Sequence, residues 1–431
     1  MRWIAPILLL FAVACATTAP PPAPPPQPLG VLAERYVRLT LEIDKLEDGY
    51  VDAYYGPAEW REQAEAQPPL AAAVLVRRAD ALTRDIEIAS PLITEPLATQ
   101  RVRYLLASVA SARLRLRMID GLEIGFADEA QGLFALRPVL QPLASFDPII
   151  ARIDALLPGE APLADRFAAL QARNAIPAEY LEPVLRAAIA ECRRRTAEYL
   201  PLPEGEAFRM ELVTGEPWGA YNWYQGGNVS LIQISADQNV TPPRALTLGC
   251  HEGYPGHHVQ GIYAERSYRQ LNWIEFSVLP LYNPVAPLYE GAGNYGVELA
   301  FPPEERLAYL RDVLYPLAGL DPNMAAEFDA VSQLFGQLAG AQRTIAAMYI
   351  DGEIDRAQAI ELLQRYRVAT PEAAEQSLRF IDRYRSYIIN YSSGEDVVRA
   401  FVEAAGDDPA ARWVAFERIM AEPLLPQDLA R

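Results

Sequence analysis

The chain of 431 residues is long enough for one large domain or two medium ones with a substantial core. Its formal net charge of −18 and its pI near 4.8 argue against nucleic acid and against an anionic membrane surface as direct partners. Membrane contact is therefore expected only through an anchor at the N-terminus.

Residues 1–14 are predicted to be a secretion signal, because Arg2 is followed by an apolar stretch too short to span a bilayer and then by small residues. Cys15 comes directly after them. This arrangement resembles the lipobox of bacterial lipoproteins, in which that cysteine becomes the lipidated N-terminus. The alternative is ordinary cleavage after Ala14. Residues 15–29 are rich in proline and predict a semi-rigid tether, and Ala16 resembles an outer-membrane address. We expect a lipid-anchored protein of the cell envelope, at the periplasmic face of the outer membrane.

Residues 30–431 are predicted to form a single, mainly α-helical domain, with residues 30–200 as a possible helical subdomain. The helix expected at 179–200 contains Cys192, and Cys250 lies in a later apolar segment. We expect free thiols, although the sequence leaves open whether the two pair. The spacing of apolar residues predicts helices at 31–46, 69–90, 97–120, 127–137, 163–172, 179–200, 304–318, 323–349, 355–367, 371–392 and 395–405.

In residues 207–235 the pattern of apolar residues changes from helical spacing to alternation. Apolar residues alternate with polar ones in 208–213 and again in 228–235, which predicts β-strands, and an aromatic-rich segment lies between them. We expect 228–235 to be an edge strand bordering a cleft, where a substrate backbone can be held by strand addition. The alternative is an aromatic hairpin that packs on the core.

All three histidines of the chain lie within residues 251–258. Imidazole is the commonest protein ligand for zinc, and Glu252 is the neighbouring carboxylate that an activated water needs as its base. Thr241 and the two prolines after it predict a helix start, which places His251 near the end of a buried helix. The window therefore predicts a metal site. The alternative is a pair of buried histidines that cap a turn.

Pro255 occupies the position four residues after His251, where zinc proteases commonly carry their second histidine. Proline lacks the N–H, and its ring clashes with the preceding turn, so the helix must kink or bulge. If Pro255 and Gly256 are looped out, His257 takes the place of the second ligand. If the helix only bends, His258 is better placed, since seven residues at 100° each return to within about 20° of His251. We favour His257 and keep His258 open.

A second segment, residues 288–299, places Glu290, Asn294 and Glu298 on one helix face at steps of four. Its three glycines each destabilise a helix by roughly 1 kcal/mol relative to alanine. We expect close approach of another backbone, plausibly that of the histidine helix, to offset this. A carboxylate in such apolar surroundings needs a positive partner, which a metal supplies. The alternative is a solvated acidic face.

The window resembles the hallmark His-Glu-x-x-Pro-Gly-His-His of a bacterial family known as domain of unknown function 885, grouped with the gluzincin zinc metallopeptidases. Residues 251–258 match this motif without a mismatch, and the resemblance covers roughly residues 30–420. The family's second motif, Glu-Gly-Trp-Ala-x-Tyr-x-x-Glu, is matched in part. In that motif Glu290, Gly291, Tyr295 and Glu298 agree, but Ala292 replaces the tryptophan.

The resemblance implies a zincin-like metallopeptidase architecture, helical with a small β-sheet beside the metal-binding helix. It implies that Glu290 is the third metal ligand, that Asn294 supports it, and that Tyr391 donates a hydrogen bond to the oxyanion. The expected Zn²⁺ ligands are His251, His257 or His258, and Glu290.

We therefore expect a zinc-dependent hydrolase that acts on a peptide or a small amide, with Glu252 as the general base. One alternative is a non-catalytic envelope binding lipoprotein that holds a structural metal. Another is a metal amidohydrolase that acts on a non-peptide amide.

Overall fold

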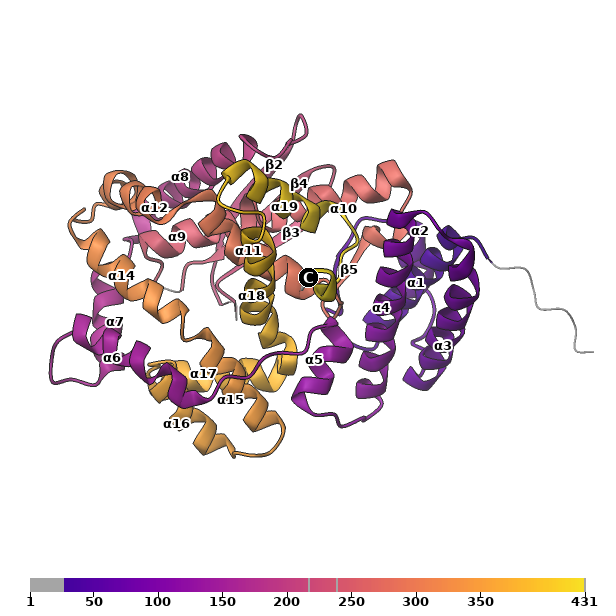
Figure 1. Ribbon diagram of the computed structural model, residues 1–431, viewed down its shortest axis with the longest axis horizontal. Helices are drawn as coiled ribbons and strands as arrows, with labels where there is room; N and C mark the ends of the chain where they lie inside the picture. Colours follow the sequence, from indigo (N-terminus) through magenta and orange to yellow (C-terminus); the bar gives the residue numbers. More distant parts are fainter. Residues whose placement is uncertain (1–26, 216–217, 238, 430–431) are drawn as a thin grey trace, which may run out of the picture.

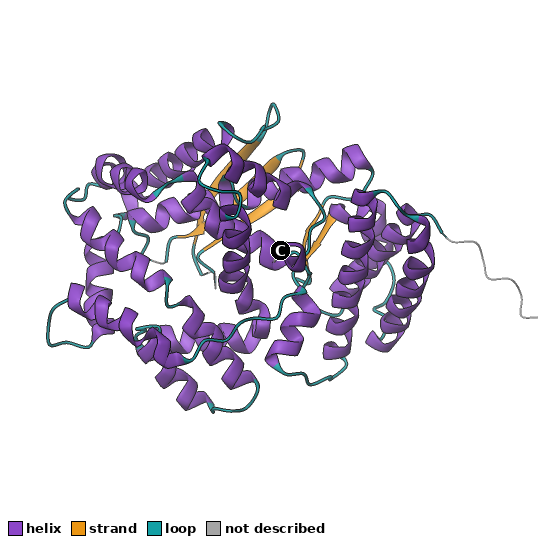
Figure 2. Cartoon of the chain, viewed as in Figure 1, coloured by secondary structure: helices purple, strands orange, loops and turns teal. Residues whose placement is uncertain are grey.

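The computed structural model describes residues 27–215, 218–237 and 239–429. The predicted signal peptide, Cys15 and nearly all of the proline-rich tether lie outside the described residues. The described chain is mainly α-helical with two small sheets (Figure 2), so the predicted fold class is confirmed at this level. Among the described helices, none combines the length and apolar character needed to cross a membrane.

The N-terminal helices pack side by side in one block, coloured indigo in Figure 1. The chain then runs through shorter helices to a long one that carries Cys192. The bounds are α1 Leu29–Asp44, α2 Ala58–Glu65, α3 Ala72–Ala89, α4 Pro96–Ile119, α5 Phe126–Phe134, α6 Asp147–Leu156, α7 Leu163–Arg173 and α8 Ala178–Ala197.

The C-terminal half begins with α9, which leads into the turn of His251, and with α10 and α11, which carry the other predicted metal ligands; further helices follow. The bounds are α9 Pro242–Leu248, α10 His257–Leu271, α11 Ala286–Ala300, α12 Pro303–Tyr309, α13 Tyr315–Leu317, α14 Met324–Gly336, α15 Ala339–Ile350, α16 Arg356–Tyr366, α17 Pro371–Tyr384, α18 Ile389–Glu403, α19 Pro409–Ala421 and α20 Pro426–Leu429. The single helix predicted at 323–349 is therefore two helices. The helix predicted at 371–392 ends at Tyr384, because Arg385 adopts a positive φ of 50°.

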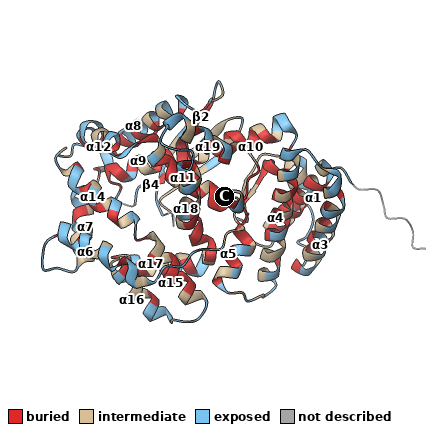
Figure 3. Ribbon diagram, in the orientation of Figure 1, coloured by how far each residue is buried: buried red, intermediate tan, exposed pale blue. Residues whose placement is uncertain are grey.

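Two hydrophobic cores lie side by side, one built mainly from α1–α7 and α14–α17 and the other from α8, α9, α18 and α19. Both α10 and α11 contribute to each core. Ala264 and Ala286 belong to the first, and Ile262 and Leu288 belong to the second. Helix α11 also packs along α18, and Figure 3 shows buried residues gathered there near the centre of the molecule. The two predicted site segments thus meet where the two cores adjoin.

The larger sheet has the strand order β2-β4-β3, with β2 Ala207–Val213, β3 Ala220–Gly226 and β4 Val229–Ser235. Strand β4 pairs in parallel with β2 and antiparallel with β3. The expectation that 228–235 is an edge strand was therefore wrong. The aromatic segment before it forms β3, which occupies the edge and turns into β4 through Gly226 and Gly227, both with positive φ. The smaller sheet pairs β1 Val51–Tyr54 with β5 Val278–Pro280, and the sequence pattern did not predict it.

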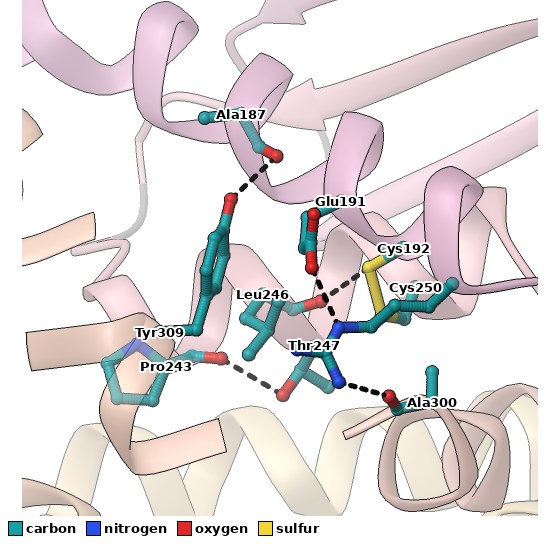
Figure 4. The surroundings of a disulfide bond; sticks show 10 residues. Ala187, Glu191, Cys192, Pro243, Leu246, Thr247, Cys250, Ala300 and Tyr309 are labelled. Atoms are coloured by element: carbon teal, nitrogen blue, oxygen red, sulfur yellow. Dashed lines mark hydrogen bonds and ion pairs between the residues drawn. A yellow bond between two sulfur atoms is a disulfide. The ribbon is translucent and has the colours of Figure 1, made fainter. Parts of the chain in front are cut away.

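Cys192 and Cys250 form a disulfide, so the expectation of two free thiols was wrong (Figure 4). Helix α8 packs against the turn that carries Cys250, which brings the two Cα atoms to 5.3 Å across 58 residues of chain. Tyr309 of α12 also contacts α8, because its hydroxyl donates a hydrogen bond to the carbonyl of Ala187 at 2.9 Å. Helical periodicity places each cysteine on an inner face but cannot show which inner faces meet.

Candidate metal centre

The histidine window interrupts a helix. Helix α9 begins after Thr241, whose side chain accepts a hydrogen bond from the Arg244 N–H at 3.4 Å, and it continues into a π-helical turn over Gly249–Gly253. The backbone then leaves the helix, and the N–H of Gly256 donates to the carbonyl of Cys250 at 3.0 Å. Helix α10 begins at His257. Pro255 and Gly256 are therefore looped out, as in the first of the two geometries considered for this window.

This path brings His251 and His257 together with Glu290 of α11. Their candidate ligand atoms all lie within 4.8 Å of one another. Nε2 of His251 lies 3.4 Å from Oε2 of Glu290, and Nε2 of His257 lies 3.8 Å from the same oxygen. The two imidazole rings are nearly perpendicular, at 86°, with centroids 4.6 Å apart.

His258 lies in a different cluster. Its Nε2 is 3.0 Å from Oε2 of Glu206, and its Nδ1 is 2.7 Å from the Ser230 hydroxyl. Tyr254 and Arg193 also donate hydrogen bonds to Glu206. Both nitrogens of this fully buried ring are engaged by the protein, so His258 is not available to the cluster of His251, His257 and Glu290.

Gln260 sets the tautomer of His257. The Gln260 amide nitrogen donates to the carbonyl of Tyr289 at 2.8 Å, so its oxygen faces Nδ1 of His257 at 2.7 Å. An amide oxygen only accepts, and Nδ1 must therefore carry the proton. Nε2 is left with its lone pair directed at Glu290, which is the tautomer that a metal ligand requires.

Glu290 is buried, and its two carboxylate oxygens differ in their contacts. Its Oε1 accepts a hydrogen bond from the Tyr387 hydroxyl at 2.9 Å, while its Oε2 is buried and has no hydrogen-bond partner among the described residues. Burial alone disfavours the charged carboxylate, but His251, His257 and Tyr387 outweigh it and lower the pKa of Glu290. Burial likewise opposes the charged form of His251, yet the adjacent Glu290 and Glu252 raise the pKa of this imidazole.

The glycines of α11 allow close packing, as expected. A Cβ at Gly293 would lie 2.8 Å from the His251 ring, and a Cβ at Gly291 would collide with the backbone of Gly394 on α18. The close approach is thus to the His251 side chain and to the α18 backbone. These contacts fix the distance between Glu290 and His251, because α11 cannot move away without opening both.

These residues fit a zinc ion. Ligands about 2.0–2.1 Å from a tetrahedral zinc lie roughly 3.4 Å from one another. The separations of 3.4 and 3.8 Å between the histidine nitrogens and Oε2 of Glu290 are close to that value. Two imidazole nitrogens, a carboxylate oxygen without a hydrogen-bond partner, and oriented outer contacts therefore form a donor set suited to zinc.

The remaining predicted residues are placed differently. Glu252 lies on the π-helical turn beside His251, and its carbonyl accepts a hydrogen bond from the Asn222 side chain of β3 at 2.6 Å. Tyr391 stands on α18, where desolvation of its hydroxyl, and then the nearby charges of Glu290 and Glu252, raise its pKa, although 37% of the residue is exposed. Asn294 does not support Glu290, because its amide donates to the carbonyl of Tyr391 at 2.9 Å.

Tyr387 holds Glu290 in the place that the resemblance assigned to Asn294. It was missed because it lies on a short 3₁₀ turn, residues 385–388, where helical spacing does not apply. The one available signal was its separation of four residues from Tyr391, which places two tyrosines on neighbouring turns.

No protein-family model matches the chain, and no curated protein sequence matches it. Similar solved structures include a protein described as a lipoprotein from Colwellia psychrerythraea, with a TM-score of 0.50 and 15% identity over 85% of this chain and 67% of that one. They also include one described as BsuCP, with a TM-score of 0.41 and 12% identity over 92% of this chain and 88% of that one. The first likeness shows a shared fold. Membership of the domain-of-unknown-function 885 family stays a prediction.

Proposed function

We propose that this protein is a zinc-dependent hydrolase of the zincin-like type that cleaves peptide bonds at the cell envelope. The observation that carries the proposal is the meeting of His251, His257 and Glu290 around a buried carboxylate oxygen that accepts no hydrogen bond from the part of the chain that the structure describes. A buried carboxylate oxygen without a donor calls for a cation. Two histidines and one glutamate are also a ligand set of catalytic zinc sites, which keep a fourth position open.

Each residue around the cluster has a proposed role. When bound, zinc would supply the Lewis acidity that activates a water molecule and polarises a scissile carbonyl. Glu252 takes the proton from the attacking water and passes it to the leaving amine. The hydroxyl of Tyr391 donates a hydrogen bond to the substrate oxygen on which negative charge develops. Gln260 and Tyr387 hold His257 and Glu290 in position.

The proposed location rests on two observations about the cysteines. Cys15 follows a short apolar signal, and the disulfide between Cys192 and Cys250 is typical of proteins from oxidising compartments. The description of the Colwellia structure as a lipoprotein agrees with this placement. We therefore propose a lipid anchor at Cys15 and a domain that works outside the cytoplasm.

Two alternatives to a zinc peptidase are a structural zinc site and an amidohydrolase that acts on a non-peptide amide. A structural zinc site closes its coordination with four protein ligands. Within the described part of the chain only three donors gather, and the His257 side chain keeps 25% of its surface exposed, which favours a catalytic site. A metal amidohydrolase that acts on a non-peptide amide would use the same residues, so only substrates separate it from a peptidase.

Metal analysis followed by a peptide-library digest tests the proposal. We expect about one zinc per chain and peptide cleavage that a chelator abolishes and added zinc restores. A protein that binds no zinc, or that cleaves equally well with chelator, contradicts the proposal. Zinc binding with cleavage of small amides but of no peptide favours the amidohydrolase.

A further inference from the structure

A recess of about 470 Å³ opens between β1 and the hairpin of β3 and β4. Its walls include Asp52 and Tyr54 on one side and Trp223, Gln225 and Gln233 on the other. Pockets of this volume hold small molecules or substrate side chains. Strand β3 contacts both β1 and the π-helical turn of Glu252, whose carbonyl accepts a hydrogen bond from Asn222. Trp223 points to the opposite face of β3 from Asn222, so Asp52, on which the charges of Glu290 and Glu252 act, is the wall residue nearest the metal cluster.

Asp52 occupies a special position on β1. Val51 pairs with Pro280 and Ala53 pairs with Leu279, so Asp52 is the extra residue of a β-bulge and has no partner across the sheet. A bulge redirects a side chain from the regular alternation of a strand, and bulges often occur beside active sites. Here the bulge belongs to the wall of the recess.

The carboxylate of Asp52 lacks a counter-ion among the described residues. Across residues 27–215, 218–237 and 239–429 it forms no ion pair or side-chain hydrogen bond, and Arg61, which also lines the recess, lies instead 5.0 Å above the ring of Tyr54. Burial, together with the charges of Glu290 and Glu252, raises the pKa of Asp52 to about 7. A half-buried carboxylate beside two others is stabilised by any cation that reaches it.

We propose that Asp52 binds a positively charged nitrogen group of the substrate in this recess, beside the metal cluster. The inference rests on the proposed hydrolase function, because the cluster defines where the scissile bond would lie. Trp223, 41% exposed, adds an aromatic face that attracts a cation and covers an aliphatic stem. The charged group is either the free N-terminus of a peptide or the side chain of a lysine, which present the same ammonium chemistry.

Calorimetric binding of a matched peptide series to zinc-loaded Glu252→Gln protein tests this without turnover. The series has one sequence with a free N-terminus, the same peptide acetylated, and an acetylated version with a single lysine. We expect at least one cationic peptide to bind about tenfold more tightly than the neutral one. Adding Asp52→Asn should abolish this preference and leave binding of the neutral peptide unchanged, whereas Asp52→Glu should keep it.

Asp48→Asn is the matched control, because it removes the same charge from an exposed position nearby and should keep the preference. The peptide that loses affinity in Asp52→Asn identifies the source of the ammonium group. Equal binding of all three peptides, a preference that survives Asp52→Asn, or no binding of any peptide overturns the proposal. Failure of wild-type zinc protein to cleave these peptides counts against the hydrolase function alone, because the binding preference is measured separately.

Discussion

Two adjacent histidines belong to clusters of opposite character. Both ring nitrogens of His258 and both carboxylate oxygens of Glu206 are hydrogen-bonded within the protein. His257 faces His251 and Glu290, where one buried carboxylate oxygen accepts no hydrogen bond from any described residue. Both clusters pair histidine with glutamate, and both are buried or nearly so.

The difference teaches how to separate a structural ion pair from a ligand site. In the His258 cluster, Tyr254, Ser230 and Arg193 supply every hydrogen bond that the pair needs, so the cluster is complete. In the His257 cluster, the outer contacts through Gln260 and Tyr387 orient the groups and leave their inner atoms free. The missing partner at the centre points to a ligand.

The largest expected effect is on catalysis. Glu252→Gln should keep near-stoichiometric zinc and an intact fold, while hydrolysis falls by about 10²–10⁴-fold, the usual range for loss of a positioned acid–base group. Glu290→Gln should instead lower zinc content and thermal stability, since metal bound to the folded state stabilises it. Elemental analysis of both variants decides this. If Glu252→Gln loses zinc while Glu290→Gln retains it, the two roles are reversed.

Removal of the disulfide tests how firmly the turn that carries His251 is tied to α8. Replacement of Cys192 and Cys250 by alanine should lower the free energy of unfolding by about 4 kcal/mol, the loop-entropy value for a separation of 58 residues. Denaturation in urea measures it, and the wild-type protein after reduction serves as the comparison. An unchanged midpoint in both would show that the packing of α8 alone holds the turn.

The cluster of His258 and Glu206 should contribute to the stability of the fold, and this contribution should depend on pH. Glu206→Gln removes the charge that His258 and Arg193 bind, and it should destabilise the fold by about 3 kcal/mol at neutral pH. Burial opposes ionisation, but hydrogen bonds from His258, Tyr254 and Arg193 lower the pKa of Glu206 from 4.5 to about 2.

A carboxylate whose pKa is lowered by folding stabilises the protein above its unfolded pKa and loses that contribution as the pH falls through its folded pKa. The stability difference between wild type and Glu206→Gln should therefore be full above pH 4.5 and shrink toward pH 2. Urea titrations of both proteins across this range measure the difference. A difference that stays constant with pH would mean that the charge of Glu206 is not what stabilises the cluster.

The smallest expected effect is on zinc affinity alone. Gln260→Ala removes the acceptor that sets the tautomer of His257 and should weaken zinc binding by about 10–100-fold, the usual range for an outer hydrogen bond. Gln260→Glu keeps an acceptor and should retain affinity. Competition with a chelator gives both values. Equal affinity in all three proteins would show that His257 needs no outer partner.

Much of the site followed from local sequence. The helices around it were predicted from apolar spacing, and the break at Pro255 followed from the missing N–H and the ring clash of proline. The glycines of α11 indicated close packing before its partners were known. These features depend on residues within a few positions of one another, so one stretch of sequence is sufficient to reveal them.

Strand β4 is central because it pairs with β2 as well as with the adjacent β3, and alternation along one strand does not show how many partners it has. Other assignments failed because the partners lie far apart in the chain, as where Asn294 donates to the carbonyl of Tyr391 on α18. Asp52 was not predicted at all, since β1 is four residues long and pairs with a strand more than 200 residues away. A strand that short carries too little periodicity to be recognised.

The sequence by itself determined a mainly helical protein whose three histidines lie beside Glu252, and a second segment that carries Glu290. Tertiary structure alone decided that His257 and not His258 faces Glu290, that Cys192 reaches Cys250, and that Tyr387 holds the carboxylate. The physical reason is that helix propensity and proline stereochemistry act within a few residues. Which inner faces meet, in contrast, depends on the packing of the whole core.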